Sequence, residues 1–173
     1  MNHRPPATET TPRPDTEALA RWLLLAAEDR STALTEWASR GVALLACGRT
    51  FDAVRVPCDL VRVATGAADD ARAAAVLRTA LNGGPVFLDR TTRQTYVLTA
   101  CGTWATDRMP QVEHLGAGYY LGVPRLDLAA GRRRSHWAGP VDRYACPTAP
   151  LHTLLVHGLQ RLRRAETATD EHA

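Results

Sequence analysis

The stretch from Val112 to Pro140 constrains the fold of this chain more than any other part of it. Two short segments, 119–123 and 135–138, are predicted there as strands, joined by an arginine-rich segment. Proline ends the first strand at Pro124, because it has no N–H to donate to a ladder. Three arginines stand just before a histidine and a tryptophan: Arg132, Arg133, Arg134, His136 and Trp137. This grouping fits an anion or base-stacking site, and equally a solvated loop beside a core tryptophan.

The rest of the chain alternates helical and strand patterns. Helices are expected over 15–28, 31–40, 57–64, 67–81 and 147–165. Further strands are expected over 42–47, 51–56, 85–88, 93–99 and 112–115. Neighbouring strands joined by tight turns favour a mostly antiparallel sheet built from hairpins, with helices packed on it. We therefore predict a single α+β domain over 15–165, with a disordered tail at 1–14 and a frayed end at 166–173.

Three local signals set the first boundaries. Asp15 and Ser31 are the expected N-caps of the first two helices, and Gly41 is placed to end the second. The continuous apolar run over 42–47 is typical of a strand covered on both faces. The turn after it predicts a hairpin with the strand over 51–56.

Composition excludes several reaction classes. All 21 basic residues are arginine. A chain without lysine has no Walker A lysine, no Schiff-base lysine and no Ser–Lys dyad. The serines are Ser31, Ser39 and Ser135, and none lies in a G-x-S-x-G turn. The formal net charge of +3 is too small to argue for a charged partner without clustering.

Hydropathy and cysteine spacing indicate the compartment. The longest apolar runs, 22–27 and 42–47, are far shorter than the roughly 20 residues of a membrane helix. Residues 1–14 resemble neither a signal peptide nor an anchor, so a cytoplasmic protein without a membrane partner is expected. The four cysteines show no C-x-x-C spacing and are expected as reduced, mostly buried thiols: Cys47, Cys58, Cys101 and Cys146.

Metal-dependent chemistry lacks its usual ligand pattern. A magnesium pair needs several carboxylates at one spot, often two at i and i+2 of a strand. No expected strand carries such a pair, and Asp52 and Asp89 are isolated at strand ends. Glu113 and His114 are strand neighbours that should point to opposite faces, which argues against an acid–base pair. We predict no metal and no cofactor, with Mg²⁺ involved only if the chain is catalytic after all.

Arg49, Asp52 and Arg55 are a second group of candidate ligand residues. If 42–47 and 51–56 form a hairpin, the three side chains could project from one end of it. The alternative is a surface ion pair worth under ~1 kcal/mol.

Three segments resemble a known family. W-A-S-R-G-V-A-L-L-A-C-G-R, at 37–49, is similar to the opening helix and strand of the bifunctional DNA primase/polymerase N-terminal (Prim-Pol) domain. This domain belongs to the archaeo-eukaryotic primase superfamily. L-G-A-G-Y-Y-L-G-V-P, at 115–124, and G-R-R-R-S-H-W, at 131–137, are similar to its closing strands. The resemblance extends over 33–140 and implies the scaffold of that domain.

The departures from the family fall on its active site. Its paired strand aspartates, which would bind metal, have no counterpart here. Its strand with a nucleotide-contacting histidine resembles T-T-R-Q-T-Y, at 91–96, where Gln94 takes the histidine's place. Glutamine can form hydrogen bonds but carries no positive charge toward a triphosphate. The resemblance therefore implies a degenerate member that keeps the scaffold without the chemistry.

Our first functional hypothesis is a non-catalytic Prim-Pol-like protein that binds a nucleotide or single-stranded nucleic acid. Arginine forks suit phosphate oxygens, and Trp137 could stack on a base. The candidate binding residues are Arg49, Asp52, Arg55, Arg93, Gln94, Arg134, His136 and Trp137. A second hypothesis is a protein-interaction or regulatory module that uses the apolar C-terminal helix, also for self-association, or a sheet edge. A third is an active primase or polymerase, a nucleotidyltransferase dependent on Mg²⁺ or Mn²⁺.

Overall fold

The computed structural model of the chain describes residues 14–104, 109–127 and 133–170. Within these ranges it forms five helices and two antiparallel sheets, which confirms the α+β single-domain prediction. The helices are α1 (Thr16–Leu24), α2 (Arg30–Arg40), α3 (Cys58–Thr65), α4 (Asp70–Ala80) and α5 (Thr148–Asp170). The strands are β1 (Val42–Ala46), β2 (Asp52–Pro57), β3 (Val86–Asp89), β4 (Gln94–Thr99), β5 (Glu113–Leu115), β6 (Tyr120–Pro124) and β7 (Ser135–Trp137). Residues 1–13 of the tail predicted at 1–14, and Arg132, lie outside the described residues.

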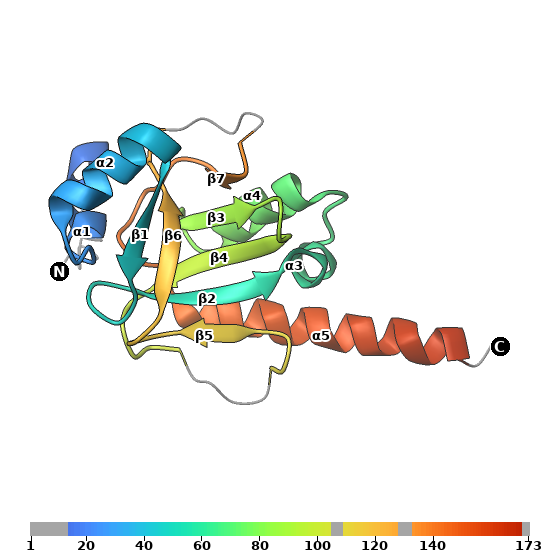
Figure 1. Cartoon of the computed structure of the whole chain (residues 1–173). Helices are drawn as coiled ribbons and strands as arrows, with labels where there is room; N and C mark the ends of the chain where they lie inside the picture. Colours follow the sequence, from blue (N-terminus) through green and yellow to red (C-terminus); the bar gives the residue numbers. More distant parts are fainter. Residues whose placement is uncertain (1–13, 105–108, 128–132, 171–173) are drawn as a thin grey trace, which may run out of the picture.

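The larger sheet has the strand order β5-β2-β4-β3-β7 (Figure 1). β4 pairs antiparallel with both β2 and β3, so β2 and β3 run parallel to each other with β4 between them. The chain crosses from β2 to β3 through α3 and α4, which makes a split βαβ unit. The predicted hairpin of β3 and β4 is confirmed, with Asp89 opposite Gln94.

Helices α3, α4 and α5 cover one face of this sheet, which we call the back face. Valines from three strands point into that layer, where they meet leucines of the helices: Val54, Val56, Val86, Val97, Leu60, Leu77, Leu151 and Leu155. The leucine stripe predicted for the last helix is therefore packed mostly inside the molecule. α5 also continues to Asp170, five residues beyond the predicted end at 165 and into the segment expected to fray.

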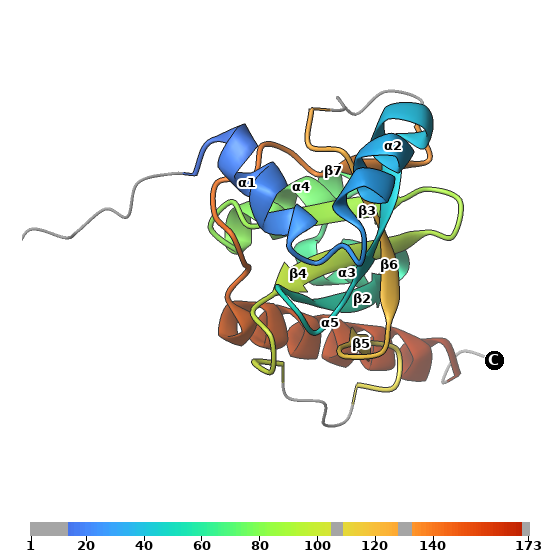
Figure 2. The ribbon, with the colours of Figure 1, turned by 60° about the vertical axis from the view of Figure 1, so that its left-hand side comes forward.

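The smaller sheet, β1 and β6, lies across half of the opposite face, which we call the front face (Figures 1 and 2). Its register runs from Val42 opposite Pro124 to Ala46 opposite Tyr120. Its inward side chains share one core with α1, α2 and the front face of the larger sheet: Leu45, Leu121, Val123, Leu23, Trp37, Ala53, Phe87, Leu98 and Trp137.

Two tryptophans fix β6 in place through their indole N–H groups. Trp37 Nε1 on α2 donates to the Val123 carbonyl at 2.9 Å, and Trp137 Nε1 on β7 donates to the Pro124 carbonyl at 3.0 Å. Both rings are buried, so each combines apolar burial with a satisfied donor. These contacts hold the small sheet over the large one.

Two predicted hairpins do not form. A tight turn closes with Gly48 N–H donating to the Phe51 carbonyl, yet β1 then joins β6 while β2 joins β4 and β5. β6 and β7 likewise belong to different sheets. The strand over 42–47 is not covered on both faces either, because Leu44 is 56% exposed. Pairing across long sequence separations wins here because each sheet needs an apolar face to bury.

Helix ends follow local chemistry with two exceptions. Asp15 caps α1 as predicted, and Gly41 ends α2 in the left-handed conformation at φ 74°. α2 is capped by Asp29 rather than Ser31, through a hydrogen bond from Thr32 N–H. α1 ends at Leu24, four residues before the predicted end.

Two further predictions concern burial. Cys47, Cys58 and Cys146 are buried and free, whereas Cys101 is exposed, in line with mostly buried thiols. Among the helices that the structure describes, none has both the length and the apolar character required to cross a membrane.

Candidate functional site

β1 and β6 leave half of the front face uncovered (Figure 1), and the strand residues of this half are polar. Arg55 on β2 stands opposite Glu113 on β5 and Tyr96 on β4, and two residues along β4 Gln94 stands opposite Asp89. Cross-strand partners share a face, so these side chains lie together. We call this group the polar patch: Arg55, Asp89, Gln94, Tyr96, Glu113 and Arg134.

Each arginine of the polar patch is held by one carboxylate. Arg55 Nη2 contacts Glu113 Oε2, and Arg134 Nε lies 3.5 Å from Asp89 Oδ2. The Arg55, Glu113 and Arg134 side chains are more than one third exposed, and such pairs contribute under ~1 kcal/mol to stability. Both guanidinium groups can therefore exchange a carboxylate for a phosphate group at small cost.

Tyr96 places a neutral phenol beside Arg55. Burial raises the pKa of Tyr96, and the nearby Arg55 guanidinium partly offsets that rise. Its ring stacks on Phe87, with centroids 5.0 Å apart and planes at 18°. The hydroxyl therefore remains protonated at neutral pH and can donate or accept a hydrogen bond on the open face.

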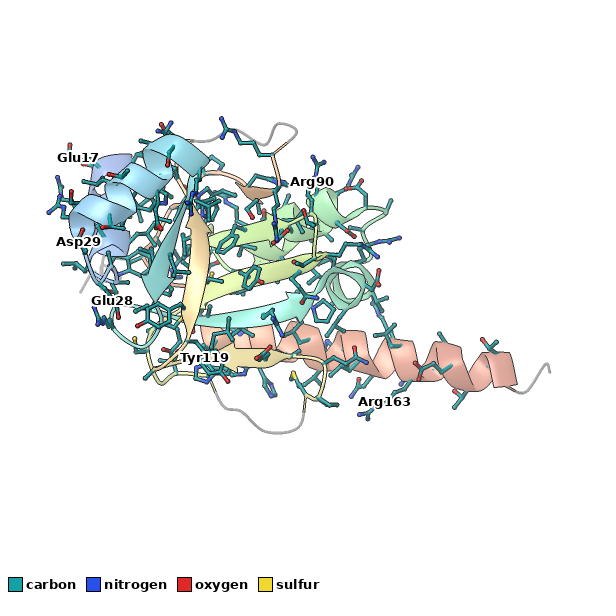
Figure 3. The ribbon with its side chains drawn as sticks, viewed as in Figure 1. Glu17, Glu28, Asp29, Arg90, Tyr119 and Arg163 are labelled. Atoms are coloured by element: carbon teal, nitrogen blue, oxygen red, sulfur yellow. The ribbon has the colours of Figure 1, made fainter. Side chains whose placement is uncertain are left out.

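The β3–β4 turn and the start of β7 form one border of the polar patch. Asp89 Oδ1 accepts hydrogen bonds from Thr91 N–H at 2.8 Å and Thr92 N–H at 3.3 Å. Arg90 N–H donates to the Arg134 carbonyl at 2.8 Å, which ties the two segments together. Figure 3 shows Arg90 at this end of the sheet, so basic side chains gather along the border.

Of the eight predicted binding residues, Arg55, Gln94 and Arg134 belong to the polar patch. Arg49 lies elsewhere, in the turn between β1 and β2, where its guanidinium approaches the α1–α2 connection. Its Nη1 donates to the Ala27 carbonyl at 3.4 Å and its Nη2 lies 3.9 Å from Glu28 Oε1. Figure 3 labels Glu28 at the end of the molecule away from Arg90.

Asp52 belongs to the back face. Its carboxylate is buried, accepts a hydrogen bond from Gly102 N–H at 2.8 Å, and lies 2.9 Å from His114 Nε2. The hypothesis that Arg49, Asp52 and Arg55 project together is therefore wrong, because β1 and β2 do not form a hairpin and Asp52 and Arg55 alternate across the sheet. The same alternation separates Glu113 from His114, as predicted.

Arg93 serves the packing of the turn rather than the polar patch. It has a positive φ of 52°, and its guanidinium donates to Asp70 at 3.0 and 3.1 Å and to Asp59 at 2.8 Å. These contacts clamp the β3–β4 turn to the first turns of α3 and α4. Hydrogen bonds from Arg93 hold the pKa of Asp70 below its usual range.

His136 and Trp137 are both buried, so neither side chain joins the polar patch on the open face. Trp137 is 5% exposed, and its ring packs edge-on against Phe87 at 5.3 Å, so it is not available to stack on a base. His136 is 4% exposed and points to the back face beside Leu88. The sequence left two alternatives for this segment, a base-stacking site or a loop beside a core tryptophan. Trp137 is a core tryptophan, because both faces of β7 are covered.

Sequence reasoning did not include Tyr96, Asp89 and Glu113 among the binding residues. Strand alternation could have identified Tyr96, since it is two residues from Gln94 on one strand and so shares its face. Asp89 follows from the hairpin register. Glu113 carried no local signal, because its pairing with Arg55 depends on β5 lying beside β2.

The donor set of the polar patch does not fit a divalent ion. Its two carboxylates are each paired with an arginine, and Asp52 lies on the other face of the sheet. Over the described ranges, no group of three or more His, Cys, Asp and Glu side chains is arranged to hold a metal ion.

Comparison with known proteins adds no relative from which residues could be transferred. No protein-family model matches this chain, and neither a curated protein nor a solved structure matches it.

Proposed function

We propose that the polar patch binds a phosphate-bearing nucleotide or single-stranded nucleic acid, without transferring nucleotides. The observation that carries the proposal is the presence of two weakly paired arginines beside a phenol and an amide on an uncovered sheet face. A guanidinium fork suits a phosphate, and the hydroxyl of Tyr96 and the amide of Gln94 suit a sugar or a base edge.

The resemblance to the Prim-Pol domain supports the same reading. In the resembling segment at 91–96, Gln94 stands where the family has a nucleotide-contacting histidine. Gln94 is a member of the polar patch. A glutamine keeps a neutral hydrogen-bonding group there. Because the donor set of the polar patch does not fit a divalent ion, we propose binding alone and no nucleotide transfer.

Fluorescence anisotropy tests this proposal with a labelled single strand of about 20 nucleotides, longer than the site of one small domain. ATP serves as a second ligand in competition. Between about 50 and 200 mM salt, binding should weaken, and Arg55→Gln or Arg134→Gln should reduce the salt slope by about 0.7 for each phosphate that the variant no longer neutralises. Arg163→Gln on α5 is the matched control, since Figure 3 places Arg163 far from Arg90.

Two outcomes would end the proposal. One is a wild-type protein that shows no salt-sensitive binding to either ligand. The other is a loss of affinity with Arg163→Gln as large as that with Arg55→Gln, which would indicate nonspecific attraction to a chain of net charge +3.

A second candidate function is protein interaction through the outer face of β1 and β6. Leu44 is 56% exposed and Tyr120 49% exposed on this face. The outer edge of β1 is already occupied, because Leu44 N–H donates to Glu36 at 2.9 Å and Ala46 N–H to the Ala26 carbonyl at 2.8 Å. A partner would therefore dock on side chains rather than add a strand.

Sedimentation velocity over a range of protein concentrations tests the second candidate in its self-association form. It predicts a concentration-dependent species that Leu44→Arg abolishes while Arg55→Gln leaves it unchanged. A wild-type protein that sediments as a monomer at every concentration would remove self-association through this face.

A further inference from the structure

A cavity of about 490 Å³ lies on the back side of the sheet, between the α3–α4 connection and the β3–β4 turn. Its lining includes three arginines, two aspartates and a leucine: Arg62, Arg90, Arg93, Asp69, Asp70 and Leu88. Leu88 points to the back face, whereas its neighbour Asp89 points to the front. The cavity is thus separated from the polar patch by the sheet.

The aspartates of this cavity already have partners. Both oxygens of Asp70 accept hydrogen bonds from Arg93. Asp69 caps α4, where its Oδ1 accepts from Arg72 N–H at 2.8 Å. The two carboxylates are therefore engaged by the protein itself, and so is the guanidinium of Arg93.

Arg62 is not balanced in the same way. Its Nε is buried and has no hydrogen-bond partner among the residues that the structure describes. Its Nη1 reaches only to 3.8 Å from Asp59 Oδ1, and that oxygen already accepts from Arg93. The Arg62 side chain as a whole is 40% exposed, but a buried donor atom without an acceptor is costly, and such atoms in native proteins usually have an unseen water, ion or ligand as partner.

His136 is not part of the lining of this cavity but is paired with a residue that is. It is the cross-strand neighbour of Leu88, which lines the cavity, and such neighbours on one face lie about 5 Å apart. Its Nδ1 is also buried and has no partner within the described part of the chain. Two nitrogen atoms without a hydrogen-bond partner therefore lie close to this space, one on the lining residue Arg62 and one on the neighbour of the lining residue Leu88, and Arg90 also lines it.

We propose that this cavity binds a phosphate group, with Arg62 Nε and His136 Nδ1 as hydrogen-bond donors and Arg90 at the rim. A phosphate oxygen is the acceptor that a guanidinium recognises best, and at least two more non-bridging oxygens remain for the imidazole and for Arg90. The site does not rest on the function proposed for the polar patch, since it uses different residues on the other face. The group can belong to free phosphate or to a phosphate monoester.

Backbone amide NMR tests this site in the full chain. Inorganic phosphate is titrated at constant ionic strength against sodium chloride, and AMP is titrated in parallel. We expect saturable shifts at Ala71, Leu88 and His136 with inorganic phosphate. Arg62→Gln should raise the apparent Kd about tenfold, as expected when a charge-assisted hydrogen bond is removed. Tighter binding of AMP at the same amides would identify a monoester as the source, and binding of inorganic phosphate alone would identify the free ion.

Arg72→Gln is the matched control, because Arg72 is an exposed arginine of the same helix layer outside this cavity. It should bind phosphate as the wild type does. If Arg62→Gln does not fold, Arg90→Gln at the rim replaces it, with thermal unfolding as the check on folding.

The proposal is overturned if inorganic phosphate produces no saturable shift at these amides. It is equally overturned if Arg72→Gln weakens binding as much as Arg62→Gln does. Phosphate also stabilises proteins in general by exclusion from their surface, so only the difference between the variants in phosphate-dependent melting temperature counts as support.

Discussion

The two halves of the front face of the larger sheet are built from the same strands but have opposite characters. Under β1 and β6, Ala53, Leu98, Phe87 and Trp137 are nearly inaccessible. Beyond them, the strands β2, β3 and β4 carry the polar patch, where Arg55 is 44% exposed. Buried Leu98 and half-buried Gln94 are only four positions apart on β4. The position of the covering sheet decides which half can meet a ligand.

Arginine side chains have two different roles in this molecule. Arg93 makes three hydrogen bonds to two aspartates and holds a turn against two helices. Arg55 has one exposed carboxylate partner. An arginine that is bound several times is part of the fold, whereas one with a single weak pair is available to a ligand. Counting arginines in a sequence does not separate the two.

The largest expected effect lies in the covered half. Trp137→Ala should lower the free energy of unfolding by about 3–5 kcal/mol, because a large ring leaves the core and the Pro124 carbonyl loses its donor. Urea unfolding monitored by circular dichroism measures this change. A decrease below about 1 kcal/mol would contradict the burial of Trp137 and reopen its role in base stacking. Trp22→Phe, at a partly buried ring, is the control.

Substitution of Asp52 should lower the free energy of unfolding by less than Trp137→Ala does, but by more than substitution of a carboxylate of the polar patch. Asp52→Ala removes a buried carboxylate and leaves Gly102 N–H and His114, which are part-buried, without their acceptor, so a destabilisation of about 1–3 kcal/mol is expected. Asp89→Ala, at the border of the polar patch, should cost about 1 kcal/mol through its turn hydrogen bonds. Equal destabilisation in urea unfolding would show that the two aspartates do not differ in environment.

The pH dependence of stability probes the covered side of β7. Burial, and to a smaller extent Arg90, lowers the pKa of His136. The unfolded state therefore binds more protons once the pH falls below the unfolded value of about 6.5, and stability is full above that pH and declines as the pH falls toward the folded pKa. His136→Leu should flatten the melting temperature between about pH 7.5 and 5.5. An unchanged slope would mean that His136 is not buried as described.

The smallest effect on stability is expected in the open half. Arg55→Gln removes an exposed pair, so the free energy of unfolding should change by no more than about 0.5 kcal/mol. The same variant should weaken nucleotide or single-strand binding, as measured by anisotropy. A large decrease in stability with unchanged binding would assign Arg55 to the fold and abolish the contrast between the two halves.

Sequence patterns located most elements correctly where the signal was local. Asp15 and Gly41 mark helix ends through side-chain capping and positive φ, which depend on a few neighbouring residues. The β3–β4 hairpin followed from its short turn. The β1–β2 hairpin failed although its turn exists, because strand partners are chosen by the burial of whole faces. The same reason explains why the predicted binding residues were scattered over both faces.

The sequence by itself determined the α+β class, the helix ends marked by Asp15 and Gly41, and the opposite facing of Glu113 and His114 on their strand, since capping and strand alternation act over a few residues. Only the tertiary structure decided that β1 joins β6, that this small sheet stops short of Arg55 and Gln94, and that Trp137 lies beneath it. The pairing of β1 with β6 joins residues more than 70 positions apart, and its free energy comes from apolar surfaces that no local pattern brings together.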